Sequence, residues 1–583
     1  NVSSRVLHQQ QPPSPLAMAT VDVMSYRTPV PLQWELTRQS EIFLEDGLYP
    51  QAYTLLYNVL ASGTISSSKA VIPLPQNLAV AATMLVHPKT TTRAQSGYEK
   101  EAASAALRFL RLTNSLVSPM DAKFDVAFAF THFESSRQGR RRQDSPTSFE
   151  PVDPDTRPLN TKFNQGSSLW TRAEDFWHAV GWAFNCSVLH PARWERWQVW
   201  LQFMCNVLED DWKERERKYT EARENQKSDS ELSEKYGNLE TENGRGVDST
   251  ESKPRRGRPS KVAPVPIDDD LEIFRESLIF RYITSNTTHG RNRRIMRAIF
   301  ANGKSSLGEF KEVFADELKT SKEDTQNTKK RAGEVNLDLD QYGDYQDHSD
   351  EDEATSDSAS RPTRRSKRTR RGTRNAMADP DDDFEMNEIP SSTSQDTTDL
   401  SSLGGYTSLA LRQQLLSILR RVSEKLPRDF IPLADLYHTF VENIRDLPLP
   451  IFQHFVTPST LPHFRPEAHS TLCELLLYVM RESSAPTSDA LCLTQSKLEE
   501  CFLPYAAATP SVGNNAKISI LLEALMTLLY KSKMLSVSEG LRNAVMAGIG
   551  RREEATRDRE SVEWDYLRES GFRLKFMVEH ILP

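Results

Sequence analysis

The chain has 583 residues, of which 38% are hydrophobic and 26% are charged. This length exceeds what one hydrophobic core uses, and the low hydrophobic fraction predicts folded blocks joined by polar, disordered segments. The formal net charge of −8 argues against a protein that binds nucleic acid over its whole surface, so local blocks of one charge sign are more informative than the sum.

The cysteine pattern indicates a reducing compartment. Five cysteines are spread over the chain and none forms a Cys-x-x-Cys pair, which argues against a zinc ribbon or a disulfide framework. We therefore expect buried thiols, with no metal site and no cofactor. No apolar run reaches about 18 residues, so we expect a soluble protein without a membrane span.

Residues 1–31 are rich in Gln, Pro and Ser and are predicted to form a disordered leader. Residues 32–237 are predicted to form an N-terminal helical domain, because apolar residues recur there at helical spacing between short breaks. The clearest predicted helices span residues 50–60, 77–86 and 98–116. The pattern is typical of antiparallel helical pairs or irregular helical repeats, with no fixed period. Residues 135–164, with several prolines and three consecutive arginines, are predicted to be an exposed disordered insertion.

Seven of the nine tryptophans lie between Trp170 and Trp212. Their spacing predicts a helical hairpin over residues 170–212, with a turn before Pro191, a favourable first helical residue. The spacing of Thr171 and Glu174 predicts a capping box at the start of the first helix. Core packing is the expected role of the tryptophans, and the alternative is that one of them reaches a partner protein.

The polar linker at 238–264 contains the run Lys-Pro-Arg-Arg-Gly-Arg-Pro-Ser-Lys from Lys253 to Lys261. A glycine between two arginines lets the backbone approach the floor of a narrow minor groove while both side chains lie along it. The run resembles the AT-hook of nuclear and chromatin proteins, although Arg255 replaces the family's proline before the core. The resemblance implies weak binding to A·T-rich DNA by Arg255, Arg256, Gly257, Arg258, Pro259 and Lys261. The alternative is a basic linker or part of a nuclear localisation signal.

A short helical segment is predicted at 265–319, with helices over 271–282, 291–300 and 307–318. Residues 320–404 are predicted to be disordered and polarised by charge. Eight acidic residues and no basic ones lie in 338–353, whereas eight basic residues and no acidic ones lie in 361–374. The basic block suits importin or the DNA backbone, since phosphate contacts require charge rather than sequence. The residues expected to make these contacts are Arg364, Arg365, Lys367, Arg368, Arg370 and Arg371.

Residues 405–583 are predicted to form a second all-helical domain, which begins with a strongly periodic helix that stops before Pro427. Further helices are predicted at 433–444, 468–480, 496–505, 518–530, 537–549 and 563–581. Four prolines at 448, 450, 458 and 462 predict one extended break between the helices at 433–444 and 468–480. The predicted fold class is therefore all-α, with two helical-repeat-like blocks separated by long linkers.

No phosphate-binding loop, nucleophile elbow or zinc-protease motif is present in the sequence. The local pairing of Cys186 and Cys205 with His178 or His190 fits buried structural residues better than a nucleophile and base. We therefore expect a nuclear, non-enzymatic scaffold that binds protein subunits of a chromatin or chromosome-maintenance complex and is weakly tethered to DNA. The alternative is a helical adaptor whose basic runs serve only as nuclear localisation signals.

Overall fold

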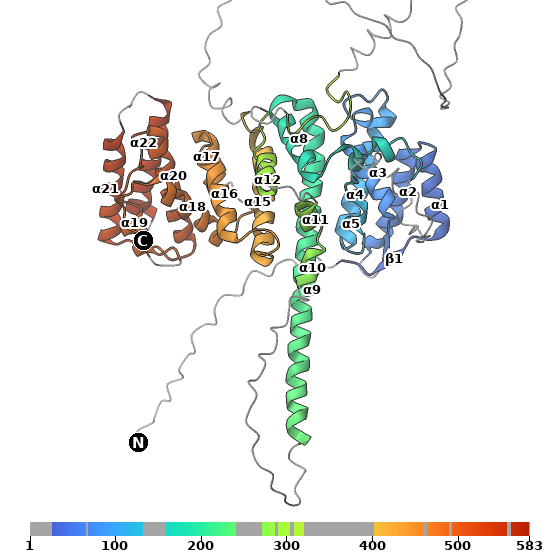
Figure 1. Ribbon diagram of the computed structural model, residues 1–583, viewed down its shortest axis with the longest axis horizontal. Coiled ribbons are helices and arrows are strands. Elements are labelled where there is room, and N and C mark those ends of the chain that lie inside the picture. Colours follow the sequence, from blue (N-terminus) through green and yellow to red (C-terminus); the bar gives the residue numbers. More distant parts are fainter. Residues whose placement is uncertain are drawn as a thin grey trace, which may run out of the picture. The chain divides into compact units, whose positions relative to one another are not determined.

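The computed structural model describes ten stretches of the chain (Figure 1). They are residues 26–65, 68–131, 159–240, 271–285, 290–303, 308–319, 401–458, 463–488, 492–556 and 561–581. Apart from one short pair of strands, the regular structure within these stretches is helical, which confirms the predicted all-α fold class.

The N-terminal block begins with strand β1 (Pro29–Pro31), which pairs in parallel with β2 (Ala70–Ile72). Its helices are α1 (Trp34–Glu45), α2 (Tyr49–Ala61), α3 (Pro75–Val86), α4 (Gly97–Leu116) and α5 (Phe124–Ala127), with short 3-10 turns η1 (Ser62–Thr64) and η2 (Pro88–Thr90). Helices α2, α3 and α4 confirm the three helices predicted most clearly here. The N-terminus of α4 is fixed by a capping box, in which the Ser96 hydroxyl accepts from Glu99 N and the Glu99 carboxylate accepts from Ser96 N.

The aromatic hairpin consists of α8 (Phe176–Leu189) and the long helix α9 (Pro191–Glu240), preceded by η4 (Gln165–Ser167) and the single turn α7 (Leu169–Arg172). The predicted capping box at Thr171 is wrong, because Thr171 already belongs to α7. Asp175 caps α8 instead, and its carboxylate accepts from His178 N at 2.7 Å. Pro191 is the first residue of α9, as predicted.

All seven tryptophans of the hairpin are buried, and none is more than 7% exposed. Three helix faces of α9 are covered, because α3, α8 and α15 pack around it. Trp197 and Trp200 contact each other edge to face with ring centroids 5.4 Å apart. Core packing is thus confirmed, and the neighbours that cover the separate faces of α9 belong to the same chain.

Three helices follow the linker: α10 (Glu272–Arg275), α11 (Leu278–Thr284) and α12 (Arg291–Ile299). The single helix predicted over 271–282 is in fact two, because Ser277 caps α11 and Asp211 on α9 accepts from Leu278 N at 3.0 Å. The helix predicted over 307–318 is wrong for the described residues 308–319, which form turns. Asp316 adopts a left-handed conformation there (φ 60°), which is incompatible with a continuous helix.

The C-terminal block is helical, as predicted. Its elements are α15 (Gly405–Lys425), α16 (Leu433–Ile444), α17 (Leu449–Val456), α18 (Pro466–Met480), α19 (Gln495–Cys501), α20 (Val512–Lys531), α21 (Glu539–Ala555), α22 (Val562–Phe576) and the π-helical turn η6 (Met577–Ile581). The extended break predicted at the prolines is wrong, because α17 lies there. Pro448 is its N-cap and Pro450 lies in its first turn, where a missing N–H removes no helical hydrogen bond.

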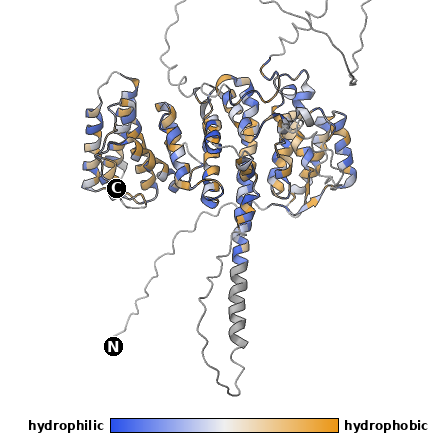
Figure 2. Cartoon of the chain, viewed as in Figure 1, coloured by the Kyte–Doolittle hydropathy of each residue, from blue (hydrophilic) through white to orange (hydrophobic). Residues whose placement is uncertain are grey.

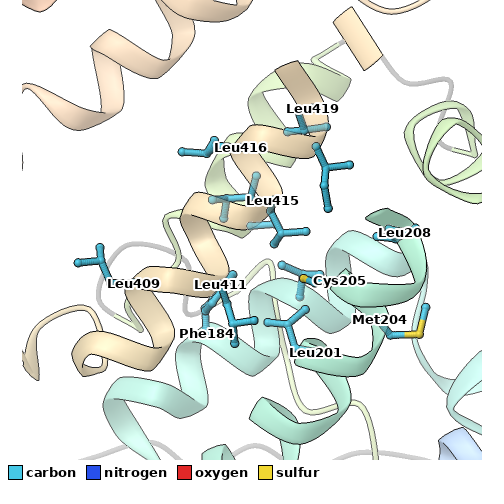
Figure 3. Packing of buried hydrophobic residues seen from close by; sticks show 14 of the residues in the cluster. Phe184, Leu201, Met204, Cys205, Leu208, Leu409, Leu411, Leu415, Leu416 and Leu419 are labelled. Carbon is cyan, nitrogen blue, oxygen red and sulfur yellow. The ribbon is translucent and has the colours of Figure 1, made fainter. Parts of the chain in front are cut away.

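The two blocks pack against each other through α15, and the described helices of both belong to one compact unit. Figure 3 shows leucines of α15, including Leu411 and Leu415, facing Leu201 and Cys205 of α9. Arg412 is fully buried at this contact and donates to the carbonyls of Ile299 and Ala301. Its Cζ atom lies 4.0 Å from the centroid of the Phe184 ring.

Figure 2 shows hydrophobic and hydrophilic residues interspersed along the helices, as expected for amphipathic helices that each bury one face. Where α9 extends beyond its neighbours, its described side chains are hydrophilic (Figure 2). Packing also reaches past two predicted boundaries. Leu159 and Phe163, placed in the predicted insertion, are buried, and so is Leu403, placed in the predicted disordered segment.

Candidate interaction sites

Both predicted basic motifs lie outside the described residues. These are the hook residues Arg255, Arg256, Gly257, Arg258, Pro259 and Lys261, and the basic-block residues Arg364, Arg365, Lys367, Arg368, Arg370 and Arg371. The structure does, however, describe both anchor points of the linker that carries the hook. That linker leaves the described chain at Glu240, the end of α9, and rejoins it at Leu271.

The return of the linker is fixed against α9 by α10. The Phe274 ring packs on Trp212 and Tyr219, with centroid distances of 5.1 and 5.3 Å. Arg215 Nη1 donates to Ile273 O at 2.5 Å. From Tyr219 to Glu240, α9 continues for about 30 Å at a rise of 1.5 Å per residue. The two ends of the linker are therefore attached to the same helix, roughly this distance apart along its axis (Figure 1).

Cys186, Cys205 and His178 of the hairpin are buried. Burial raises the pKa values of the Cys186 and Cys205 thiols well above their usual range. Burial also lowers the pKa of His178, whose Nδ1 accepts from Glu174 N at 3.1 Å while Nε2 donates to Lys311 O at 3.0 Å. Both imidazole nitrogens are thus used to hold the backbone. Within the described stretches, no three His, Cys, Asp or Glu side chains are grouped to hold a metal ion.

A buried ion pair connects α9 to the turns at 308–319. Arg193 and Glu317 are 4% and 0% exposed at their side chains, and Arg193 Nε donates to Glu317 Oε1 at 2.8 Å. Glu317 Oε1 also accepts from Trp197 Nε1 at 2.6 Å, and Oε2 accepts from Phe314 N at 3.2 Å. Arg193 additionally donates to Thr91 Oγ1 at 3.0 Å. Every charged atom here has a protein partner, so this cluster is structural.

Two of the four arginines of α12 contact carboxylates. Arg294 pairs with Asp175 at 2.9 Å, and Arg297 pairs with Glu309 at 2.7 Å. We therefore do not assign α12 as an anion site.

An open groove of about 470 Å³ lies between the end of α8 and the turns at 308–319. Its walls include Trp182 and Leu189 of α8, and Phe310 and Leu318 of the turns. Asn185 joins the two sides of the groove, because its Oδ1 accepts from Gly303 N and its Nδ2 donates to Phe310 O. No feature of the groove specifies one class of occupant.

A second cleft, of about 260 Å³, lies between α9 and the end of α15. We call it the α9–α15 cleft, and it is lined by Glu216, Tyr219, Thr220, Glu424, Lys425 and Arg465. Both of its carboxylates have partners outside this lining. Glu216 accepts from Arg421 Nη2 at 2.9 Å, and Glu424 pairs with Arg420 at 3.1 Å.

The cations of the α9–α15 cleft surround an aromatic ring. Lys425 Nζ lies 5.7 Å from the centroid of the Tyr219 ring, and Arg223 Cζ lies 5.4 Å from it. Arg465 is exposed and immediately precedes α18. Cations near an aromatic face retain their charge for a further ligand, because the ring does not neutralise them.

Sequence reasoning missed this cleft. The final turns of α15 do contain three basic residues, Arg420, Arg421 and Lys425, but the sequence prediction used only the apolar stripe of that helix. Arg465 follows a proline-rich stretch and carries no local signal of its own. Its approach to Tyr219 depends on how α15 packs on α9.

No helix in the described part of the chain is long and apolar enough to cross a membrane. Comparison with known proteins gives no family model, no curated protein and no solved structure that matches this chain.

Proposed function

We propose that this protein is a nuclear, non-enzymatic scaffold of a chromatin- or DNA-associated complex, tethered to DNA through its hook-like motif. The observation that carries this proposal is the Arg256-Gly257-Arg258 core in the linker. Its partners are A·T-rich DNA, bound weakly, protein subunits of a chromatin or chromosome-maintenance complex, and importin. The helical blocks contribute the surfaces for protein partners.

The anchoring of the linker supports a tether. A single short motif reading the minor groove has little affinity, so occupancy depends on additional contacts that raise the effective concentration. Helix α9 carries one end of the linker about 30 Å along its axis from the Tyr219 contact, at 1.5 Å per residue. The linker is therefore anchored at both ends on one helix, which leaves the surfaces of the other helices accessible to other proteins.

The buried chemistry supports a non-enzymatic role. The thiols of the hairpin have raised pKa values, and the His178 imidazole is hydrogen-bonded at both nitrogens. The Arg193–Glu317 pair is satisfied within the protein. These groups stabilise the fold instead of presenting reactive atoms in a cleft.

The alternative function is a helical adaptor without DNA contact, whose basic runs only bind importin. Measurements of nuclear import and of DNA binding distinguish this adaptor from the DNA-tethered scaffold. In the alternative, neutralising the basic block with Arg364→Ala/Arg365→Ala abolishes import, and neutralising the hook changes no DNA interaction.

The deciding measurement is an electrophoretic shift with the full chain on A·T-rich and G·C-rich duplexes of equal length. We expect a preference for the A·T-rich duplex that disappears in Arg256→Ala/Arg258→Ala. The control is Lys531→Ala/Lys533→Ala, which removes the same charge from two exposed positions at the C-terminal end of α20. Equal shifts for wild type and the hook variant on A·T-rich DNA would reject the tether.

A further inference from the structure

We propose that the α9–α15 cleft binds the phosphodiester backbone of the same DNA that the hook engages. The inference deepens the proposed function and rests on it for the presence of DNA. It assigns a second, sequence-independent contact to residues Lys425 and Arg465, with Arg223 at the edge of the cleft. Minor-groove readout and phosphate contact would then act together on one duplex.

The electrostatics of the cleft favour an anion. Its two carboxylates are held by Arg420 and Arg421, which do not line it, so they are neutralised from outside. By contrast, Lys425 and Arg465 face the cleft and form no ion pair in the described part of the chain. The charges of the lining that have no ion-pair partner are therefore positive. Lysine and arginine donate to phosphate oxygens, and this contact does not depend on the base sequence.

The shape of the cleft fits a backbone contact. A volume of about 260 Å³ accommodates a phosphate group with its first water molecules but not a nucleotide pair. Tyr219 forms one wall, and the charged groups of Lys425 and Arg223 both lie within 6 Å of the centroid of its ring. The bases of a bound duplex would stay outside, so the contact carries no sequence information.

The position of the cleft brings it within reach of the hook. Tyr219 also contacts Phe274, three residues after the linker rejoins the described chain at Leu271. Ten residue steps separate Lys261 from Leu271, which span at most about 35 Å when fully extended. That is about the length of ten base pairs of duplex DNA. One duplex of about twenty base pairs can therefore contact both sites.

The test is a titration of the full chain with fluorescent twenty-base-pair duplexes, one A·T-rich and one G·C-rich, at several salt concentrations. The variant is Lys425→Gln/Arg465→Gln, and Lys531→Gln/Lys533→Gln is the charge-matched control. Each lost phosphate contact lowers affinity about eightfold at 0.1 M salt and reduces the slope of log affinity against log salt by about 0.9. We expect these losses on both duplexes for the cleft variant and wild-type affinity for the control.

Wild-type affinity in the cleft variant, or an equal loss in the control, overturns the inference. A second measurement follows the Tyr219 ring by NMR during titration with inorganic phosphate and with the G·C-rich duplex. Shifts with phosphate alone would show an ion site rather than a DNA site, which also overturns it. Failure of the hook has a different signature, because the A·T preference disappears while the cleft variant still weakens binding to both duplexes.

Discussion

Replacing Glu317 by glutamine should detach the turns at 308–319 from α9. The change keeps the side-chain shape but removes the charge that balances Arg193, which is 4% exposed. Glu317 accepts through both oxygens, Oε1 from Arg193 and Trp197 and Oε2 from Phe314 N. A glutamine side chain has only one acceptor oxygen. Its NH2 group would therefore face either Phe314 N–H or the Arg193 guanidinium, and two donors would meet without an acceptor.

The expected loss is large because both partners are buried. Removing one member of a buried pair leaves an uncompensated charge and costs about 3–5 kcal/mol. The control is Glu101→Gln, which removes a pair with Arg108 whose side chains are 53% and 55% exposed. Water screens that pair, so its loss should change stability by about 1 kcal/mol or less.

The assay is urea denaturation followed by tryptophan fluorescence, since seven of the nine tryptophans lie in the hairpin that Glu317 contacts. Far-UV circular dichroism at zero urea checks that each variant is still helical. Adding Arg193→Gln to Glu317→Gln should cost less than Arg193→Gln costs alone, because the pair is coupled. A loss for Glu317→Gln no larger than that of the exposed control would refute the reasoning.

Two further outcomes are expected from residues of the C-terminal block. A Cβ added at Gly548 would lie 1.8 Å from Leu503 O, whereas a Cβ added at Gly550 would meet nothing within 4 Å. In denaturation experiments, Gly548→Ala should therefore destabilise the protein by about 1–3 kcal/mol. Gly550→Ala should stabilise it by about 0.5–1 kcal/mol, because alanine favours a helix more than glycine does. Equal effects of the two alanines would contradict this packing. Burial lowers the pKa of His469 to about 4, below its unfolded value of about 6.5, so the unfolded state binds the proton first and stability falls as pH drops through this window. His469→Asn should reduce the slope of unfolding free energy against pH there by about 1.4 kcal/mol per unit, and an unchanged slope would count against it.

Helical periodicity predicted most of the elements because it reports which face of a segment is buried. Helices α2, α4 and α16 were predicted within a few residues of their observed bounds. The errors occur where a distant residue decides the local structure. Asp211 ends the first helical turn after the linker by accepting from Leu278 N, and no pattern within that segment encodes the contact.

The prolines after α16 gave a different kind of error. Four prolines within a short range predict an extended break, because proline disrupts a helix interior. Pro448 and Pro450 instead stand at the N-terminus of α17, where the same ring geometry favours a helix. The proline content of this stretch does not by itself say whether a helix is broken or begun. That depends on whether each proline lies in the first turn of a helix or in its interior.

The sequence by itself determined the all-helical class, the burial of the tryptophan hairpin and the hook-like motif, since each depends on neighbouring residues or on local spacing. The tertiary structure decided which charges are neutralised and which remain uncommitted. Arg193 meets Glu317 across 124 positions, and Lys425 and Arg465 share a cleft with Tyr219 only because α15 packs on α9. Which charged side chains pair depends on the distance between them, and the spacing of residues along the sequence does not give the distance between separate helices.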